Sequence, residues 1–226
     1  MRKIIQRAVI YPNFKYQSIE KINGYNIIYL GSEFCANMMP SLSDIQTAID
    51  KGYEKVVLFV PFLTQRRFKD YSRLIDFSVK KFKKFIEIST SDLGIINLLS
   101  LKYPDLPKNI SRPLSIEFVR MKEELLKKAI LELKIDAIET DEPLFAEKIK
   151  KMNVKVYFHS DFAFVAVQRH CPFVGKITYK CNRLCKGREI TLNVPESNYK
   201  IYVRNNVYLK KEKKILKGVY RIIHWP

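Results

Sequence analysis

The 226-residue sequence contains few glycines, cysteines and tryptophans, seven, four and one respectively, and no long hydrophobic run. With 47% hydrophobic and 28% charged residues and so little glycine, it is neither fibrous nor disordered. No apolar stretch approaches the roughly 20 residues that span a bilayer. The chain also lacks a glycine-rich phosphate loop, a nucleophile motif and a His-Glu-x-x-His helix, so nothing supports a P-loop protein or a serine or zinc hydrolase. We therefore expect an ordinary globule with one substantial core.

A secretory leader is not expected either. The opening stretch, Met1 to Arg7, is basic, but Gln6 and Arg7 interrupt its apolar run before a signal-peptide core could form. We therefore expect a cytoplasmic protein, in which thiols stay reduced and disulfides are uncommon.

Acidic residues are scarce relative to basic ones: 23 Asp and Glu stand against 41 Lys and Arg, which gives a net charge of +18. Such a charge attracts a polyanion or an anionic substrate, although a lysine-rich solvated surface explains it equally well. Basic runs occupy 80–84 and 210–214, the second close to Tyr202 and Tyr208. Basic residues interleaved with aromatics suit RNA, so RNA and an anionic small molecule are the expected partners.

Buried strands alternate with amphipathic helices through the first 160 residues. In "SLSDIQTAIDKG", Ser43 and Gln46 have the spacing of a capping box, and Gly52 ends the helix. Three prolines interrupt the pattern between 103 and 113. The rhythm predicts an α/β, TIM-barrel-like fold in a single domain, 1–226, with an incomplete or open barrel as the alternative. The predicted strands lie at 7–11, 25–31, 55–63, 85–90, 135–140 and 154–159.

The alternation of strands and helices stops near residue 160. We assign 1–165 to the barrel-like region and 166–226 to a cysteine-bearing segment with a small β appendage. The appendage is predicted from "GREITLNVPESNYKIYVRNNVYL", which alternates and turns like antiparallel strands.

Functional groups of such a barrel gather at the carboxyl ends of its strands. The four acids that we expect to shape a pocket there are Glu33, Asp92, Asp141 and Asp161. His159 is a candidate general base, although a histidine at a strand end is commonly structural. Other polar residues that follow the predicted strands are Thr64, Gln65, Ser91 and Glu142.

Three of the four cysteines lie in "HCPFVGKITYKCNRLC", as Cys171, Cys181 and Cys185, and the fourth is Cys35, 136 residues before Cys171. Cys35 follows a predicted strand, so the topology can bring all four to one end of the barrel. Four unrelated buried cysteines are an alternative, although the polar stretch around Cys181 and Cys185 is unlike a core.

Four thiolates suit zinc or a [4Fe–4S] cluster in ligand type. The wide spacing favours the cluster, since structural zinc sites usually offer Cys-x2-Cys pairs. His170 could replace or orient a thiolate.

Four segments carry a resemblance to a known family: "IIYLGSEFC", "KVVLFVPFLTQ", "STSDLGIINLL" and "FAFVAVQRHCPFVGKITYKCNRLCKGREITL". Together they resemble the collagenase-like peptidase superfamily, and most closely its UbiV-type iron–sulfur members of anaerobic ubiquinone biosynthesis. The resemblance implies that a [4Fe–4S] cluster is ligated by Cys35, Cys171, Cys181 and Cys185.

Relatives in that superfamily act in oxygen-independent hydroxylation, of a quinone ring with a homologous UbiU-like partner subunit or of RNA bases. Others are peptidases, which is the weakest expectation here because metal-bound thiolates are not free nucleophiles. The hypothesis from a different class is a non-catalytic basic RNA-binding protein with a structural zinc ion or cluster.

Overall fold

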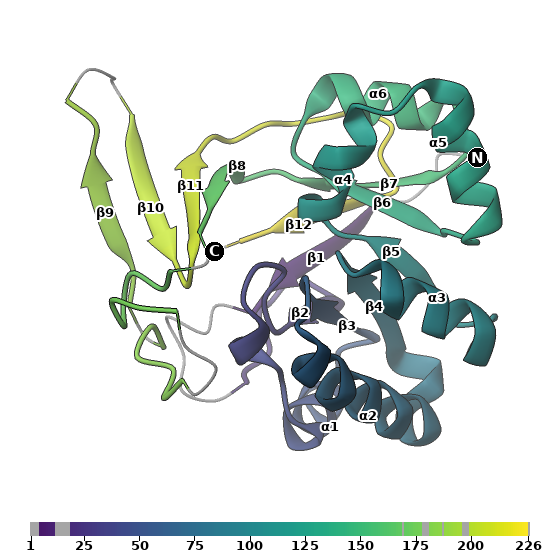
Figure 1. Ribbon diagram of the computed structural model, residues 1–226, viewed down its shortest axis with the longest axis horizontal. Helices are drawn as coiled ribbons and strands as arrows, with labels where there is room; N and C mark the ends of the chain where they lie inside the picture. Colours follow the sequence, from purple (N-terminus) through teal and green to yellow (C-terminus); the bar gives the residue numbers. More distant parts are fainter. Residues whose placement is uncertain are drawn as a thin grey trace.

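The computed structural model describes residues 5–11, 19–168, 170–177, 181–186, 188–195 and 199–225. Eight parallel strands form a closed barrel with helices between strands, so the TIM-barrel-like prediction is confirmed and the open alternative is wrong (Figure 1). Around the barrel the order is β1 (Gln6–Ile10), β12 (Arg221–His224), β7 (Lys155–His159), β6 (Ala137–Thr140), β5 (Lys108–Ile110), β4 (Ile86–Thr90), β3 (Lys55–Val60) and β2 (Ile27–Leu30).

Helices cover the outside of the barrel and bury their apolar stripes against it, as Ile45 and Ala48 do in the first helix. That helix begins at a capping box of Ser41 and Asp44, so the predicted box of Ser43 and Gln46 was wrong by two residues. The spacing is the one predicted, because Asp44 lies three residues after Ser41, as Gln46 does after Ser43. The helices are α1 (Leu42–Asp50), α2 (Gln65–Phe82), α3 (Leu93–Lys102), α4 (Arg112–Val119), α5 (Glu123–Glu132) and α6 (Pro143–Lys150), with 3-10 turns η1 (Ala36–Met38) and η2 (Lys83–Phe85).

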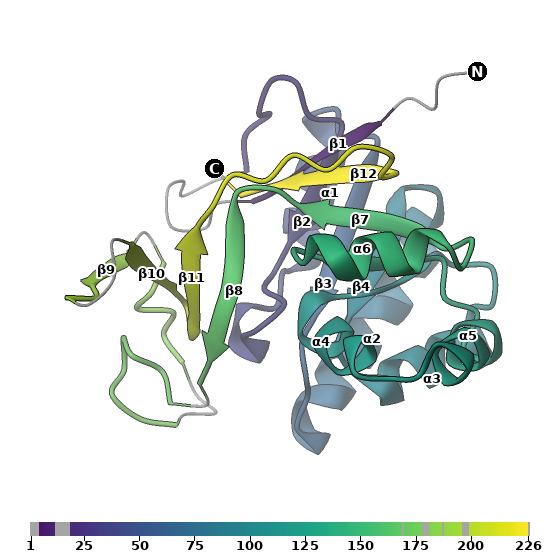
Figure 2. The same cartoon turned by 90° about the horizontal axis from the view of Figure 1, so that it is seen from above.

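A separate antiparallel sheet stands beside the barrel and confirms the predicted appendage (Figure 2). It contains β8 (Phe162–Val167), β11 (Val207–Lys211), β10 (Lys200–Arg204) and β9 (Ile190–Asn193), in that order. The predicted division at residue 165 does not separate the two parts, because β8 crosses it and β12 returns from the appendage to the barrel. β12 pairs in parallel with both β1 and β7 and so closes the barrel.

The inside of the barrel is unusually polar. TIM-barrel interiors are usually filled by branched apolar side chains, and here Val57, Phe59 and Ile223 belong to such a layer. Buried polar side chains accompany them: Glu87, Ser89, Asn109, Glu139, His159 and Arg221. Because burying polar groups costs free energy, their concentration at one place indicates a functional interior. Among the described residues, no helix is both long and apolar enough to cross a membrane.

Candidate functional site

The loop after β2 presents two of the predicted residues at the carboxyl end of the strands, here called the barrel mouth. Gly31 has a φ of +93°, and a Cβ on it would lie 3.2 Å from the Pro40 side chain and 3.3 Å from the Phe59 carbonyl oxygen. Only glycine suits that position. The turn it makes places Glu33 at a small pocket of the barrel mouth, whereas Cys35 lines a second cavity.

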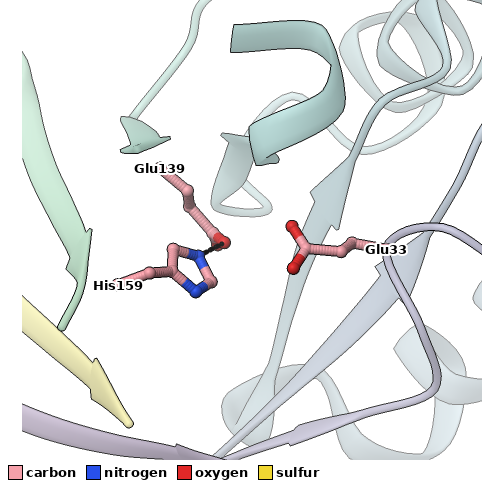
Figure 3. Close-up of side chains that lie close together, drawn as sticks. All are labelled: Glu33, Glu139 and His159. Atoms are coloured by element: carbon pink, nitrogen blue, oxygen red, sulfur yellow. Dashed lines mark hydrogen bonds and ion pairs between the residues drawn. The ribbon is translucent and has the colours of Figure 1, made fainter. Parts of the chain in front are cut away.

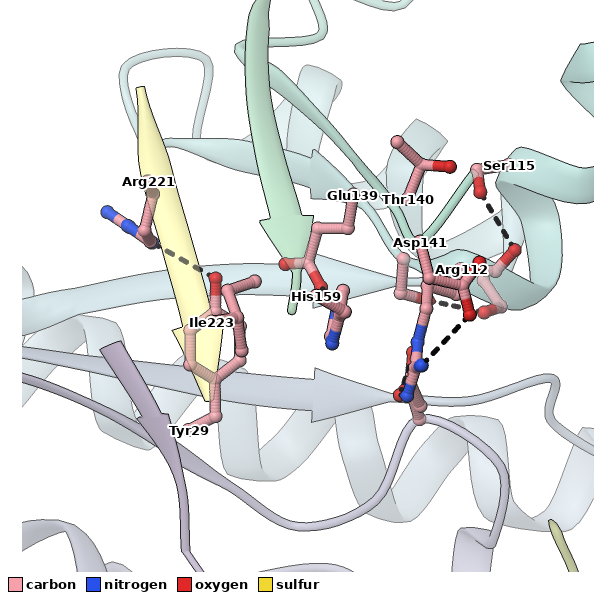
Figure 4. Close-up of polar contacts among 12 residues, drawn as sticks. Tyr29, Arg112, Ser115, Glu139, Thr140, Asp141, His159, Arg221 and Ile223 are labelled. Atoms are coloured by element: carbon pink, nitrogen blue, oxygen red, sulfur yellow. Dashed lines mark hydrogen bonds and ion pairs between the residues drawn. The ribbon is translucent and has the colours of Figure 1, made fainter. Parts of the chain in front are cut away.

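A buried arginine, Arg112, joins two of the predicted acids, Glu33 and Asp141. Figure 4 labels Arg112 and Asp141 side by side. Arg112, at the start of α4, donates from Nε to the two Glu33 carboxylate oxygens at 3.0 and 3.2 Å. Its Nη1 donates to Asp141 Oδ2 at 3.2 Å and to the Phe162 carbonyl oxygen at 3.1 Å. Burial alone would lower the pKa of Arg112, but Glu33 and Asp141 raise it, so the guanidinium is charged. Arg112 therefore ties together the loops that follow β2, β5 and β6 and the start of β8.

Beside this ion pair lies a buried pair of Glu139 and His159, joined at 3.0 Å between Oε2 and Nε2. Burial, and then the charge of Glu33, raise the pKa of Glu139 to about 8. Burial and Arg112 lower the pKa of His159 well below its ordinary value. At neutral pH both groups are therefore mainly uncharged, and the protonated carboxyl can donate a hydrogen bond to the imidazole nitrogen. The predicted general base, His159, is thus turned into the barrel rather than toward Asp161.

Glu33, Glu139 and His159 also have the composition of a metal site, since their ligand atoms all lie within 4.8 Å of one another (Figure 3). Arg112 argues against a resident divalent ion, because its guanidinium already holds Glu33 and would repel a second cation. Asn109 Oδ1 and Nδ2 are buried without a hydrogen-bond partner among the described residues. Such atoms are available to bind a polar molecule in the barrel. The arrangement best suits a proton donor.

The raised pKa of Glu139 gives a prediction for stability against pH. The folded chain keeps this proton up to pH about 8, whereas the unfolded chain releases it near pH 4.5. Glu139 therefore lowers the free energy of unfolding as pH rises between those values, by up to about 1.4 kcal/mol per pH unit. Glu139→Gln removes the titrating group. In urea unfolding across this window, we expect the variant to gain stability over the wild type as pH rises. If the free energies of unfolding of the variant and the wild type changed with pH in parallel, the raised pKa of Glu139 would be contradicted.

Asp161 and a histidine that the sequence analysis missed form a second acid–imidazole pair at the rim. His224 Nδ1 lies 3.1 Å from Asp161 Oδ2 and 3.1 Å from Ser160 Oγ, and Asp161 also accepts from the Trp225 backbone N–H at 2.9 Å. Burial alone would raise the pKa of Asp161, but the hydrogen bonds from His224 and Trp225 lower it. The signal in the sequence was the end of "RIIHWP", where a polar residue follows a short apolar run, as at the other strands.

The remaining predicted residues have structural contacts. Asp92 caps α3 and accepts from the Ile95 and Leu63 backbone N–H groups at 3.1 and 3.0 Å. Its carboxylate is therefore used in holding the loop after β4, and we do not include it in the site. Thr64 caps α2, Glu142 caps α6, and Ser91 bonds Ser111.

All four cysteines line one cavity of about 130 Å³, and none is in a disulfide. Cys35 lies directly before η1 on the barrel side, and the other three come from the segment between β8 and β9. Its other lining residues are Phe34, Ala36, Asn37, Met38, Asn205 and Asn206. His170 is exposed and is not among these lining residues. The topology thus brings together four thiols that are far apart in the sequence.

The chemistry of this cavity suits a metal centre that takes thiolate ligands. Burial raises the pKa of Cys185 to about 12 and that of Cys35 above its ordinary value, and the neighbouring cysteines add to both shifts. Four thiolates here therefore need a positive centre between them. A tetrahedral zinc ion, with Zn–S bonds of about 2.3 Å, holds its sulfurs about 3.8 Å apart. Among the described residues, no three cysteine sulfurs lie within 4.8 Å of one another. The sulfurs therefore do not form a closed tetrahedral zinc site as they stand, and a [4Fe–4S] cluster takes ligands of the same type.

The turn between β10 and β11 connects this cavity to the barrel mouth. Asn206 Nδ2 donates to the carbonyl oxygens of Phe34 and Gln168, both at 3.0 Å. Its neighbour Asn205 lines the cysteine cavity and also the small pocket that contains Glu33. The cysteines and the buried acids therefore lie on either side of one turn.

Comparisons with known proteins give little beyond the fold. Neither family models nor curated proteins give a match. One solved structure, from Silicibacter pomeroyi DSS-3 and named for glycerophosphoryl diester phosphodiesterase activity, is similar to this chain at 8% identity and a TM-score of 0.47. The similarity covers 70% of this chain and 83% of the other. At that level it carries no argument about the reaction.

Proposed function

We propose that the chain is a [4Fe–4S] protein of the collagenase-like peptidase superfamily, most similar to its UbiV-type members. The observation that carries the proposal is the meeting of Cys35, Cys171, Cys181 and Cys185 around one cavity. Their burial and mutual electrostatic cost as thiolates support a metal centre, and a cluster agrees with the finding that, among the described residues, no three of the sulfurs lie within 4.8 Å of one another. A bound cluster would supply single-electron transfer.

We further propose that the chain is an enzyme or enzyme subunit in oxygen-independent hydroxylation of a quinone precursor or an RNA base. The residues around the barrel mouth support a reaction site next to the cluster. Arg112 holds Glu33 and Asp141 in fixed positions, and Glu139 holds a proton at neutral pH inside the barrel. A homologous partner subunit and a cytoplasmic location remain predictions. Peptidase activity has no support, because all four thiols would be committed to the cluster.

The test of cluster binding is the colour and metal content of the wild-type chain purified without oxygen. We expect a brown protein with about four irons per chain. A colourless protein with one zinc ion per chain would instead assign the cavity to a structural metal. That result would shift support to the basic RNA-binding protein. RNA binding of that kind should weaken linearly, on logarithmic axes, with salt concentration.

A further inference from the structure

A larger, open cleft of about 490 Å³ lies between the barrel mouth and the appendage. Its volume is in the range of small-molecule sites, about 300–1,000 Å³. The smaller pocket at Glu33 shares Arg204 and Trp225 with this cleft and shares Asn205 with the cysteine cavity. The cleft is therefore next to the proposed reaction site, although none of the cysteines lines it.

The cleft is lined by packed aromatic rings. Phe162 makes edge-to-face contacts with Tyr202 and Trp225, at centroid distances of 5.6 and 6.2 Å. The Arg204 guanidinium lies over Phe162 and Trp225, 4.2 and 4.9 Å from their centroids. Rings fixed in this way form a rigid apolar surface, on which a planar ring can pack at low entropic cost.

The rim of the cleft is positive. Lys211 and Lys213 line it, whereas Lys210 and Lys214 pair with Glu212, which is not among the lining residues. Lys210 and Lys214 are not among the lining residues, so Lys211 and Lys213 are the lysines of this segment that face the cleft. Glu189, the other acid that lines the cleft with Asp161, pairs with Arg204. The two lysines therefore favour an anionic group at the rim.

The Asp161–His224 pair adds a hydrogen-bonding group. His224 Nδ1 lies 3.1 Å from Asp161 Oδ2, which leaves Nε2 as the ring nitrogen that a ligand in the cleft can contact. A hydroxyl group on the ligand can pair with this nitrogen in either tautomer, because a hydroxyl both donates and accepts hydrogen bonds. The pair also holds Trp225 in place through its backbone N–H.

We propose that this cleft binds a small planar aromatic anion that carries a hydroxyl group. The ring packs on Phe162, Tyr202 and Trp225, the anionic group lies at Lys211 and Lys213, and the hydroxyl forms a hydrogen bond with His224. The interpretation of the cleft as a substrate site rests on the proposed function. On that basis, the lining of the cleft indicates the chemical class of the substrate. An aromatic acid and a nucleotide both present a ring and an anion, so the experiment includes one of each.

Trp225 is the single tryptophan of the chain, so its fluorescence reports this cleft. We would titrate the full chain with 4-hydroxybenzoate, using cyclohexanecarboxylate as an anion without an aromatic ring and phenol as an uncharged ring. We expect a saturable change in tryptophan fluorescence with 4-hydroxybenzoate. Either control should bind at least tenfold more weakly. Stronger saturation with uridine 5′-monophosphate would support the same site with a nucleotide ligand. No saturation with either aromatic anion, or equal binding of cyclohexanecarboxylate, would overturn the proposal.

Two matched lysine variants localise the anion. Lys211→Gln with Lys213→Gln should weaken binding about tenfold, whereas Lys210→Gln with Lys214→Gln removes the same charge and should change it less than twofold. Equal effects of the two double variants would contradict a specific anion site. Repeating the titration with Cys35→Ser separates this proposal from cluster binding, since a chain without the cluster should still bind the aromatic acid. Binding lost together with the cluster would refute an independent cleft.

Discussion

Replacing Cys35 with serine is expected to leave the anaerobically purified chain colourless, with iron falling from about four per chain to a small fraction of that. Cys35 is the only one of the four thiols supplied by the barrel, and the other three belong to the segment between β8 and β9. Its loss therefore removes the ligand that joins the two parts. Iron analysis and the visible spectrum measure the effect.

A matched control is Ala36→Ser, which adds a hydroxyl to the same cavity and keeps all four thiols. This variant should retain the colour and most of the iron. Urea unfolding of both variants checks that the barrel is intact. Full iron content in Cys35→Ser would remove Cys35 from the ligand set and with it the main support for the proposed site.

Replacing Arg112 with methionine is expected to lower the free energy of unfolding by about 3–5 kcal/mol. Arg112 and Glu33 are both nearly inaccessible, with 1% and 2% of their side chains exposed, and Asp141 is 15% exposed. Methionine fills a similar volume but leaves the two acids buried near each other without their cation. Urea unfolding at neutral pH measures the loss.

Arg120→Met provides the control, because Arg120 and its partner Glu117 are exposed by 73% and 59%. An ion pair of that kind contributes about 0–1 kcal/mol. Adding Glu33→Gln to Arg112→Met should recover part of the lost stability, since it removes one of the orphaned charges. A loss below about 1 kcal/mol in Arg112→Met would show that the buried ion pair does not organise the barrel mouth.

The fold could be predicted where periodicity is strong and not where strands are short. The apolar runs at β2, β3, β4, β6 and β7 and the helices between them gave the barrel architecture. β5 was missed as a definite strand because Lys108–Ile110 lies among prolines, and β12 because Arg221 and His224 bracket only two apolar residues. Both are recognisable only once their neighbours in the barrel are known, since pairing rather than composition stabilises them.

The candidate site was predictable where its residues follow strands that were themselves predicted. Glu33, Cys35, Asp141 and Asp161 follow strands, and position after a strand is sufficient to place a residue at the rim. Asp92 follows a strand too, but it also directly precedes α3, and its carboxylate caps that helix. Arg112 follows β5 and His224 is the last residue of β12, the two strands that were not assigned, and Glu139 points inward from within a strand. An inward-pointing acid cannot be distinguished in sequence from one facing outward without knowing the register.

The pairing of β1 with β12 also affects the order in which the molecule assembles. Residues 6–9 pair with residues 221–224, a separation that is nearly the whole chain, and contacts so distant in sequence form late and slowly. His224 and Trp225 reach the cleft together with that last pairing. A partly folded chain with an open barrel would therefore lack both the imidazole of His224 and the Trp225 ring of the aromatic surface. Ligand binding competence should arise in the slowest folding phase, together with barrel closure.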